Sequence, residues 1–316
     1  KVYTVHLKKI GQEKMYVSPQ TVGHWWQMTV VHLASLSYHL FSINKKIATN
    51  SLRNYPKLIR NLSLLFSCSL SIACMPRQVR AVDENNSLRV LSYNIKHGRG
   101  MDGKVDLPRI AKVIRSVSPD LVALQEIDRN CTRSGAVDLT SELGNLLGME
   151  GRFGEFMDFQ GGEYGMAVLS KFPIIDHQVH PLPIGAEPRC ALEIRVNTGA
   201  KFGEISFVGI HNDWTRVDFR VAQCKALVEK LDNLQLPVIL AGDFNAGRDS
   251  ESVELLLGSG FEILAKNKVN TFPSTLPKVE IDFIMSRGLK NKKFTHSVID
   301  ERIASDHRPV LIELTR

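Results

Sequence analysis

Carboxylate, amide and imidazole side chains recur at the ends of apolar segments along this 316-residue chain. An aspartate precedes an asparagine by two residues in "LAGDFNA", and an aspartate and a histidine are adjacent in "IASDHRPVLIEL". Oxygen donors of this kind suit Mg²⁺, Mn²⁺ or Ca²⁺ rather than structural Zn²⁺. Histidines can transfer protons or stabilise a phosphate oxygen, and an aspartate beside an asparagine could hold and deprotonate a water molecule. The complete set is Asn94, Glu126, His211, Asp243, Asn245, Asp282, Asp306 and His307.

Taken singly, most of these residues have an ordinary structural interpretation. Asn94 alone fits a turn, "GDFN" alone fits an Asx-turn, and His211 alone fits a histidine satisfied within the core. Asp282 is harder to explain in this way, because a buried carboxylate is costly unless it is paired or bound to a metal. Ligands gather where strand ends converge, so the recurrence of these groups at the ends of distant segments favours one shared site.

The segments that carry the set alternate between strand-like and helix-like patterns. Many strands separated by only a few helices predict a layered α/β sandwich with mixed sheets. Residues 82–316 are enough for one domain with a large core. Helices are predicted over 107–117, 137–148 and 218–234, and strands over 88–95, 118–127, 236–245, 279–286 and 309–314, with three more ending near 171, 196 and 211.

The first 81 residues differ in composition from the remainder. They hold 11 of the 40 Lys and Arg residues and a single acid, whereas residues 82–316 hold 29 basic and 32 acidic residues, a net charge of −3. A short apolar run at 62–73, after basic residues that begin at Arg53, predicts a signal peptide over about 53–81 with cleavage near Ala81. A buried helix and a lipoprotein signal at Cys74 are the alternatives. Residues 1–50 could contain a poor membrane helix or be upstream sequence that is not in the natural protein, and residues 1–81 as a whole are excluded from fold reasoning.

Several classes of protein lack support in the sequence. There is no G-x-S-x-G, no Walker A loop and no G-x-G-x-x-G after a strand. The sequence therefore lacks the motifs of serine hydrolases, NTPases and dinucleotide-binding proteins. Cys131, Cys190 and Cys224 are too scattered for a disulfide framework or a metal site, and allow at most one bridge. The slightly acidic part after residue 81 gives no support for non-specific binding to polyanions.

Seven motifs in this order resemble the endonuclease/exonuclease/phosphatase superfamily, the fold of DNase I. They cover roughly residues 88–314, and "GDFN" with "SDH" is the most specific pair. Arg220 and Gln223 match a further pair found after the His211 motif in compact secreted bacterial members. The motifs are "LSYNIKHG", "LVALQEID", "YGMAVLSKFP", "VGIHND", "LAGDFNA", "VEIDFIMS" and "SDHRPVLIEL". The resemblance implies a four-layered α/β sandwich with two mixed, mainly antiparallel sheets flanked by helices.

The resemblance also implies a role for each residue of the set. Asn94, Glu126 and Asp306 would bind a divalent metal ion, Mg²⁺ or Mn²⁺ with Ca²⁺ as an option. Asp243 would orient and activate the attacking water, and Asn245 would contact the phosphate or the nucleophile.

The two histidines have roles of their own in the resemblance. His307, held by Asp282, would bind a phosphate oxygen in the transition state. His211 matches a second phosphate-stabilising histidine of the DNase I-like and 5-phosphatase branches, which argues against the abasic-site endonuclease branch.

The substrate is less defined than the reaction. Arg99, Arg133 and Arg189 are candidates for binding anionic groups, although each could equally be an ordinary surface arginine. Trp214 could stack on a base or a sugar, but we favour a packing role for it.

The resulting expectation is a secreted or periplasmic, metal-dependent hydrolase that acts on a small or lipid-headgroup phosphate ester by water attack on phosphorus. A secreted nuclease and an inert binding module on the same fold are the alternatives. The acidic mature part does not favour nucleic acid as the partner. We expect a monomer without a stable membrane span.

Overall fold

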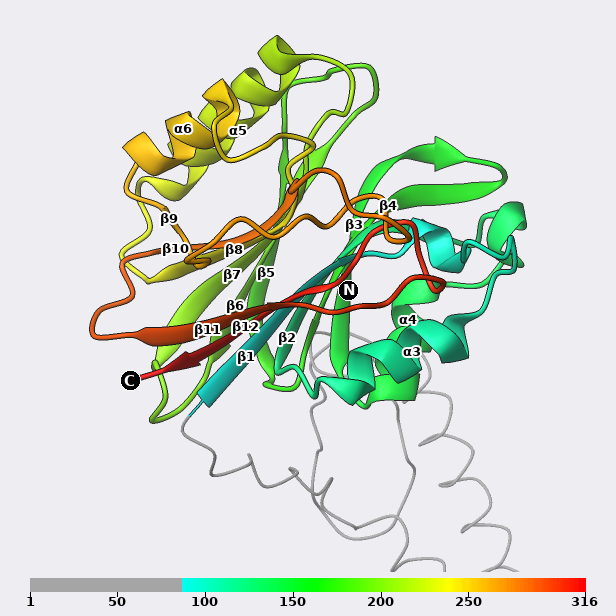
Figure 1. The fold of residues 1–316 in the computed structure, drawn as a ribbon, viewed down its shortest axis with the longest axis horizontal. Coiled ribbons are helices and arrows are strands. Elements are labelled where there is room, and N and C mark those ends of the chain that lie inside the picture. Colours follow the sequence, from blue (N-terminus) through cyan, green and yellow to red (C-terminus); the bar gives the residue numbers. More distant parts are fainter. Residues whose placement is uncertain (1–86) are drawn as a thin grey trace, which may run out of the picture. The chain divides into compact units, whose positions relative to one another are not determined.

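A computed structural model describes residues 87–316, which form two six-stranded sheets covered by helices (Figure 1). The expected leader, with its signal peptide at about 53–81, lies outside the described residues and stays a prediction. In the described part, no helix is long and apolar enough to cross a membrane.

Sheet 1 has the strand order β11-β12-β1-β2-β4-β3 and sheet 2 the order β5-β6-β7-β8-β10-β9. The strands are β1 (Ser87–Asn94), β2 (Leu121–Arg129), β3 (Glu150–Phe159), β4 (Gly162–Ser170), β5 (Ile174–Pro181), β6 (Cys190–Asn197), β7 (Glu204–His211), β8 (Val238–Asp243), β9 (Glu262–Ile263), β10 (Asp282–Arg287), β11 (Lys293–Val298) and β12 (Val310–Thr315). Each sheet contains one parallel pair, β1–β2 or β7–β8, and its other pairs are antiparallel.

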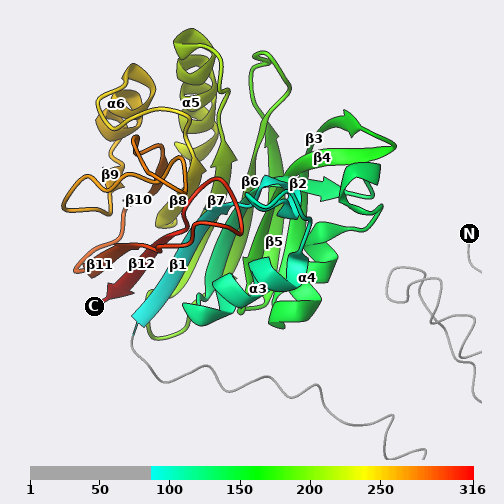
Figure 2. The same cartoon turned by 45° about the vertical axis from the view of Figure 1, so that its right-hand side comes forward.

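The core has three layers of apolar side chains, as expected for helix–sheet–sheet–helix packing. One cluster fills the space between the sheets and includes Val90, Phe207 and Ile312. A second lies between sheet 1 and the helices α3 (Leu107–Ser116) and α4 (Leu139–Leu147). A third lies between sheet 2 and the helices α5 (Val217–Leu231) and α6 (Glu251–Gly258). Figure 2 shows the two helix pairs on opposite sides of the sheets. The expected α/β sandwich is confirmed.

The ends of α3 and α4 are fixed by capping residues. Asp106 caps α3 by accepting a hydrogen bond from the Arg109 N–H, and Pro108 occupies its first turn. Asp138 caps α4, and Gly148 closes it in a left-handed conformation at φ 66°. The predicted helices therefore agree with α3, α4 and α5 within three residues. The short helix α6 and the strands β3, β5, β9 and β11 were not predicted.

The three cysteines of the described part, Cys131, Cys190 and Cys224, are free and buried. None of them takes part in a disulfide bond within residues 87–316.

Candidate active site

The two parallel strand pairs deliver three residues of the expected set to the same end of the molecule. In β1–β2, Asn94 lies opposite Gln125, and in β7–β8, His211 lies opposite Asp243. The carboxyl ends of parallel strands share one edge of a sheet, so each pair places two polar groups side by side. The antiparallel strand β10 begins at this edge, where Asp282 pairs with Asp243.

Side-chain alternation explains why these groups face the gap between the sheets. In β1, Leu88 and Val90 belong to the inter-sheet cluster, and Ser92 and Asn94 continue the same row toward the strand end. The same parity leads from Ile205 and Phe207 to His211 in β7, and from Ile239 and Ala241 to Asp243 in β8. The apolar rows of both sheets therefore end in the polar site.

Glu126 joins the site through an irregularity of β2. Val122 and Leu124 belong to the cluster under α3 and α4, so regular alternation would turn Glu126 away from the site. The pairing of β2 with β4 shifts register between Gln125 and Ile127, and Glu126 has a left-handed backbone at φ 57°. A bulge of this kind re-aims one side chain, here toward Asn94. Glu126 was predicted at the end of its strand, but β2 continues to Arg129.

Asn94 connects the two sheets. Its Nδ2 donates hydrogen bonds to Glu126 Oε1 at 3.1 Å in sheet 1 and to Asp243 Oδ2 at 3.2 Å in sheet 2. Its Oδ1 accepts from the backbone N–H of Lys96 at 3.1 Å. One buried amide thus fixes the distance between the two halves of the site.

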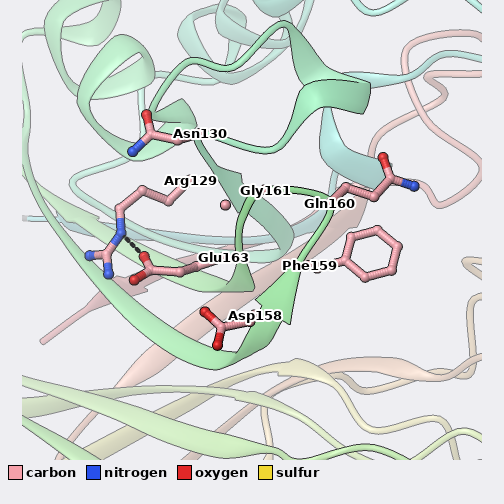
Figure 3. A pocket seen from close by; sticks show the side chains of 8 residues that line it. Arg129, Asn130, Asp158, Phe159, Gln160, Gly161 and Glu163 are labelled. Atoms are coloured by element: carbon pink, nitrogen blue, oxygen red, sulfur yellow. Dashed lines mark hydrogen bonds and ion pairs between the residues drawn. The ribbon is translucent and has the colours of Figure 1, made fainter.

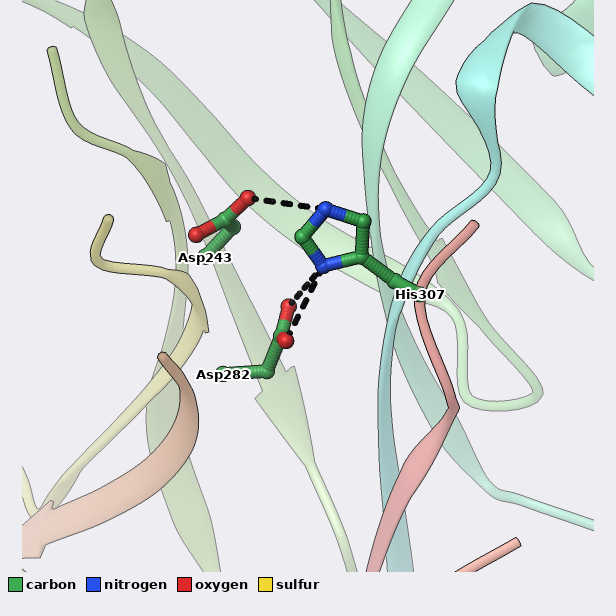
Figure 4. Close-up of side chains that lie close together, drawn as sticks. All are labelled: Asp243, Asp282 and His307. Carbon is green, nitrogen blue, oxygen red and sulfur yellow. Dashed lines mark hydrogen bonds and ion pairs between the residues drawn. The ribbon is translucent and has the colours of Figure 1, made fainter. Parts of the chain in front are cut away.

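His307 is held by two buried carboxylates (Figure 4). Its Nδ1 lies 3.0 and 3.2 Å from the oxygens of Asp282, and its Nε2 lies 3.7 Å from Asp243 Oδ2. The Thr271 hydroxyl donates to Asp282. Burial alone would lower the pKa of His307, but the charges of Asp282 and Asp243 outweigh it and raise the pKa to about 10. His307 is therefore an imidazolium at neutral pH.

Asp243 lies between both histidines. His211 Nε2 is 3.7 Å from Asp243 Oδ2, the oxygen that His307 also approaches. Burial and the neighbouring Asp282 raise the pKa of Asp243 to about 7. Burial lowers the pKa of His211 well below its ordinary value, and the charges of Arg189 and His307 act in the same direction. His211 is therefore neutral where His307 is charged.

Asn245 has a left-handed backbone at φ 50° directly after β8. Its backbone N–H donates to Asp243 Oδ1 at 2.8 Å, and its Nδ2 donates to the carbonyl of Asn212 at 3.0 Å. The turn "GDFN" thus holds the aspartate and the asparagine as one unit.

Asn94, Glu126 and Asp306 fit a divalent cation by their donor chemistry. Burial raises the pKa of Glu126, and the nearby Asp306 adds to this effect although the Asn94 amide opposes it. A divalent ion would supply positive charge that favours the ionised form of Glu126. A second grouping, Asp243, Asp282 and His307, has ligand atoms within 4.8 Å of one another. It suits a metal less, because an imidazolium cannot ligate and its Nδ1 is bound to Asp282.

The candidate substrate residues differ in their surroundings. Arg189 is 4% exposed, lies over the ring of Phe156 and reaches the partly exposed Glu187 at 2.9 Å, while its Nε is buried without a partner. Arg99 is exposed on the loop after β1. Trp214 is 64% exposed, so the expected packing role is wrong. The strand β7 has ended before it, and Asp213 turns the chain outward by accepting from the N–H groups of Thr215 and Arg216.

Arg133 is committed to an ion pair instead of being free for substrate. Its Nε and Nη2 donate to the two oxygens of Asp128 at 2.8 and 2.7 Å, and Asp128 is fully buried. We expect Arg133→Met to lower the free energy of unfolding by about 3 kcal/mol, because it leaves a buried carboxylate unpaired. Asp128→Asn should cost less, since the Arg133 side chain is 26% exposed and can turn to water.

Urea unfolding of both variants and of the double variant measures this order. The double variant should recover part of the loss. A larger loss for Asp128→Asn than for Arg133→Met would contradict the prediction.

Several residues of the site were not recognised from the sequence. Lys96 Nζ lies 2.6 Å from Asp306 Oδ2. Its position two residues after Asn94 in "SYNIKHG" was the one feature of the sequence that could have indicated a place in the site. Asp213 is fully buried and accepts from the Ala186 N–H at 2.7 Å, which ties the β5–β6 loop to the chain after His211. Gln223, which the sequence had already matched to a pair in the family, supports the same corner, accepting from the Asp213 N–H at 2.8 Å and donating to the Pro183 carbonyl at 3.2 Å.

A hollow in the described residues lies apart from this chemistry. It has a volume of about 550 Å³ and is formed at the β3–β4 hairpin by residues such as Arg129, Asp158 and Glu163 (Figure 3). Arg129 and Glu163 pair with each other there. None of the residues that line it belongs to the expected set, so we assign it no part in the reaction.

Two mixed sheets packed face to face, with acids, amides and imidazoles gathered where their strands end, define a DNase I-like α/β sandwich with a hydrolase-type site. The chain belongs to the endonuclease/exonuclease/phosphatase family, whose sequence model matches residues 91–307. Members of this family are hydrolases that act on phosphate esters, typically with a divalent metal ion.

The similarity to known proteins covers most of the chain. An uncharacterized Escherichia coli K12 protein, YbhP, is 28% identical over 250 residues, which cover 72% of this chain and 96% of that protein. Solved structures similar in fold include the Bacteroides thetaiotaomicron mannosyl-6-phosphatase Bt3783, with a TM-score of 0.59 at 21% identity over 72% of this chain and 100% of that one. The human Nocturnin catalytic domain with bound sulfate has a TM-score of 0.56 at 19% identity over 74% of this chain and 96% of that one.

Proposed function

We propose that the protein is a divalent-metal-dependent hydrolase that cleaves a small or lipid-headgroup phosphate ester by attack of water on phosphorus. One observation carries the proposal: a neutral and a charged imidazole both approach Asp243 Oδ2, at 3.7 Å each, beside the Asn94–Glu126 pair. This arrangement offers a base for water and a cation for a phosphate oxygen within one buried cluster.

Each residue of the cluster has a chemical task. Asn94, Glu126 and Asp306 would hold the metal ion, which would stabilise negative charge on the phosphate oxygens. Asp243, with a pKa of about 7, accepts the proton of the attacking water, and Asn245 holds its carboxylate in place. The imidazolium of His307 donates to a phosphate oxygen, and Asp282 fixes its ring and its charge. Neutral His211 can donate a further hydrogen bond to the phosphate.

The surroundings of the cluster support a compact anionic substrate. The buried guanidinium of Arg189 has one partly exposed acid as its partner and acts on His211, so an anionic group of the substrate would complete its pairing. The rings of Phe156 and Tyr164 are buried and face this guanidinium, which leaves them unable to stack on bases. The similar fold of a protein named as a mannosyl-6-phosphatase adds support for a small substrate.

A secreted nuclease is the second candidate. The exposed indole of Trp214 favours it, because exposed aromatic side chains provide stacking surfaces for single-stranded nucleic acid. Secretion itself is proposed from the sequence of the leader. N-terminal sequencing of the exported protein should begin near Val82, and a start well before this residue would contradict it.

A substrate panel tests the proposed function. The full chain is incubated with Mg²⁺ or Mn²⁺ and with sugar phosphates, a chromogenic phosphodiester, phospholipids, RNA and plasmid DNA. We expect turnover of one of the small or lipid esters, abolished by EDTA and restored by either metal. Rapid plasmid degradation at about nanomolar enzyme would favour the nuclease. Turnover that survives exhaustive chelation would disprove the metal-dependent mechanism.

A further inference from the structure

The loop that follows β1 has an unusual backbone. Lys96 and His97 are in the left-handed region at φ 48° and 46°, and Gly98 follows at φ 78°. This conformation is unfavourable for residues with a side chain, so two such residues in succession require a compensating contact. The Lys96 backbone N–H donates to Asn94 Oδ1, which fixes the start of the turn inside the proposed metal site.

The turn directs the Lys96 side chain to Asp306. Its Nζ lies 2.6 Å from Asp306 Oδ2, with the two side chains 35% and 20% exposed. Lys96 therefore touches two of the three proposed metal ligands, Asn94 through its backbone and Asp306 through its ammonium. The carbonyl of Asp306 accepts from the Ser274 N–H at 2.6 Å, so the backbone that carries this carboxylate is also anchored.

An ammonium and a divalent cation cannot both occupy the same side of one carboxylate. Each is attracted to Asp306, and the two repel each other at contact distances in a partly buried site. Neither partner is free to move its backbone away, because Lys96 is anchored on Asn94 and Asp306 on Ser274.

We propose that Lys96 sets the affinity of the metal site, because its ammonium competes with the divalent ion for Asp306. The inference rests on the proposed function and concerns binding of the ion, not the chemical step. Lys96 is thus a positioning residue that determines how much divalent ion the site requires.

Mn²⁺ binding to the full chain, stripped of metal, tests this inference by isothermal titration calorimetry. Lys96→Met keeps the length of the side chain and its left-handed backbone but removes the charge. We expect it to bind Mn²⁺ about fivefold more tightly than the wild type, a change suited to the loss of a partly exposed ion pair and of the repulsion. Lys96→Arg keeps the charge and should stay within about twofold of the wild type. Lys104→Met, a change at an exposed lysine of the same loop, should leave the affinity unchanged.

The possible results separate this inference from the proposed function. Equal or weaker Mn²⁺ binding by Lys96→Met, with a circular dichroism spectrum like that of the wild type, overturns the inference. If Glu126→Gln abolishes Mn²⁺ binding in the same series, the proposed metal site stands even then. If the wild type binds no Mn²⁺, or binds it unchanged after Glu126→Gln, the metal site of the proposed function fails and the inference fails with it.

Discussion

Replacing Asp243 with asparagine is expected to lower kcat by about 10³-fold, within the range found when a catalytic base is removed. The substituted amide would keep the size of the side chain and its contact with the Asn245 N–H, but it could not accept a proton from water. The native carboxylate is also the shared neighbour of His211 and His307, so its charge acts on both imidazoles. The measurement is kcat on the preferred substrate of the panel at saturating metal.

Asp218→Asn provides the matched control for this experiment. Asp218 is an exposed acid at the start of α5 that pairs with Arg216. This variant should retain wild-type kcat. If Asp243→Asn retained it as well, the assigned mechanism would be wrong, and another group would have to accept the proton of the attacking water.

Replacing Asp282 with asparagine is expected to make the activity sensitive to alkaline pH. In the wild type, burial lowers the pKa of His307, but Asp282 and Asp243 together raise it to about 10, so the imidazolium persists below that pH. The Asp282→Asn substitution removes the larger of the two carboxylate effects, and the pKa of His307 falls. The alkaline limb of the kcat/KM profile should therefore move down by more than about one pH unit, which corresponds to loss of one charge partner at this distance.

Stability of the metal-free protein gives a second, independent measurement of the same pair. A histidine whose folded pKa lies above its ordinary value stabilises the fold fully below about pH 6.5, and this contribution is lost as pH rises toward 10. The difference in free energy of unfolding between the wild type and Asp282→Asn should therefore shrink across this interval. A pH-independent difference, or an unshifted alkaline limb, would show that Asp282 does not control the charge of His307.

The convergence of the site could be predicted from the sequence because strand ends carry the chemistry. Asn94, His211 and Asp243 each close an apolar strand, and parallel pairing brings such ends to one edge. Glu126 was predicted for the site, but the bulge that turns its side chain there was not. Regular alternation along β2 would point Glu126 away from the site, and "LVALQEID" contains no local signal for the bulge. The pairing of Asp282 with His307 was implied by resemblance and is present in the structure.

Other features depend on tertiary context that no local pattern records. The strand β3 is half-exposed along most of its length and shows no regular alternation, so its pairing with β4 was not predicted. The edge strand β5 is largely exposed for the same reason. Lys96 was not predicted for the site, because neither its left-handed backbone nor its contact with the distant Asp306 can be read from the sequence. Trp214 was expected to pack because it is large and apolar, but the turn at Asp213 exposes it.

Because Asn94 bridges the two sheets, the packing between the sheets determines the spacing of the residues in the site. The gap that Asn94 spans, from Glu126 in one sheet to Asp243 in the other, is set by the bulk of side chains such as Phe207 and Ile312. Close-packed interiors transmit changes of volume instead of absorbing them. Selection for turnover therefore acts on apolar residues that never meet the substrate, and a larger residue on one sheet calls for a smaller one opposite. In this molecule, substitutions in the core between the sheets would change the distance from Glu126 to Asp243.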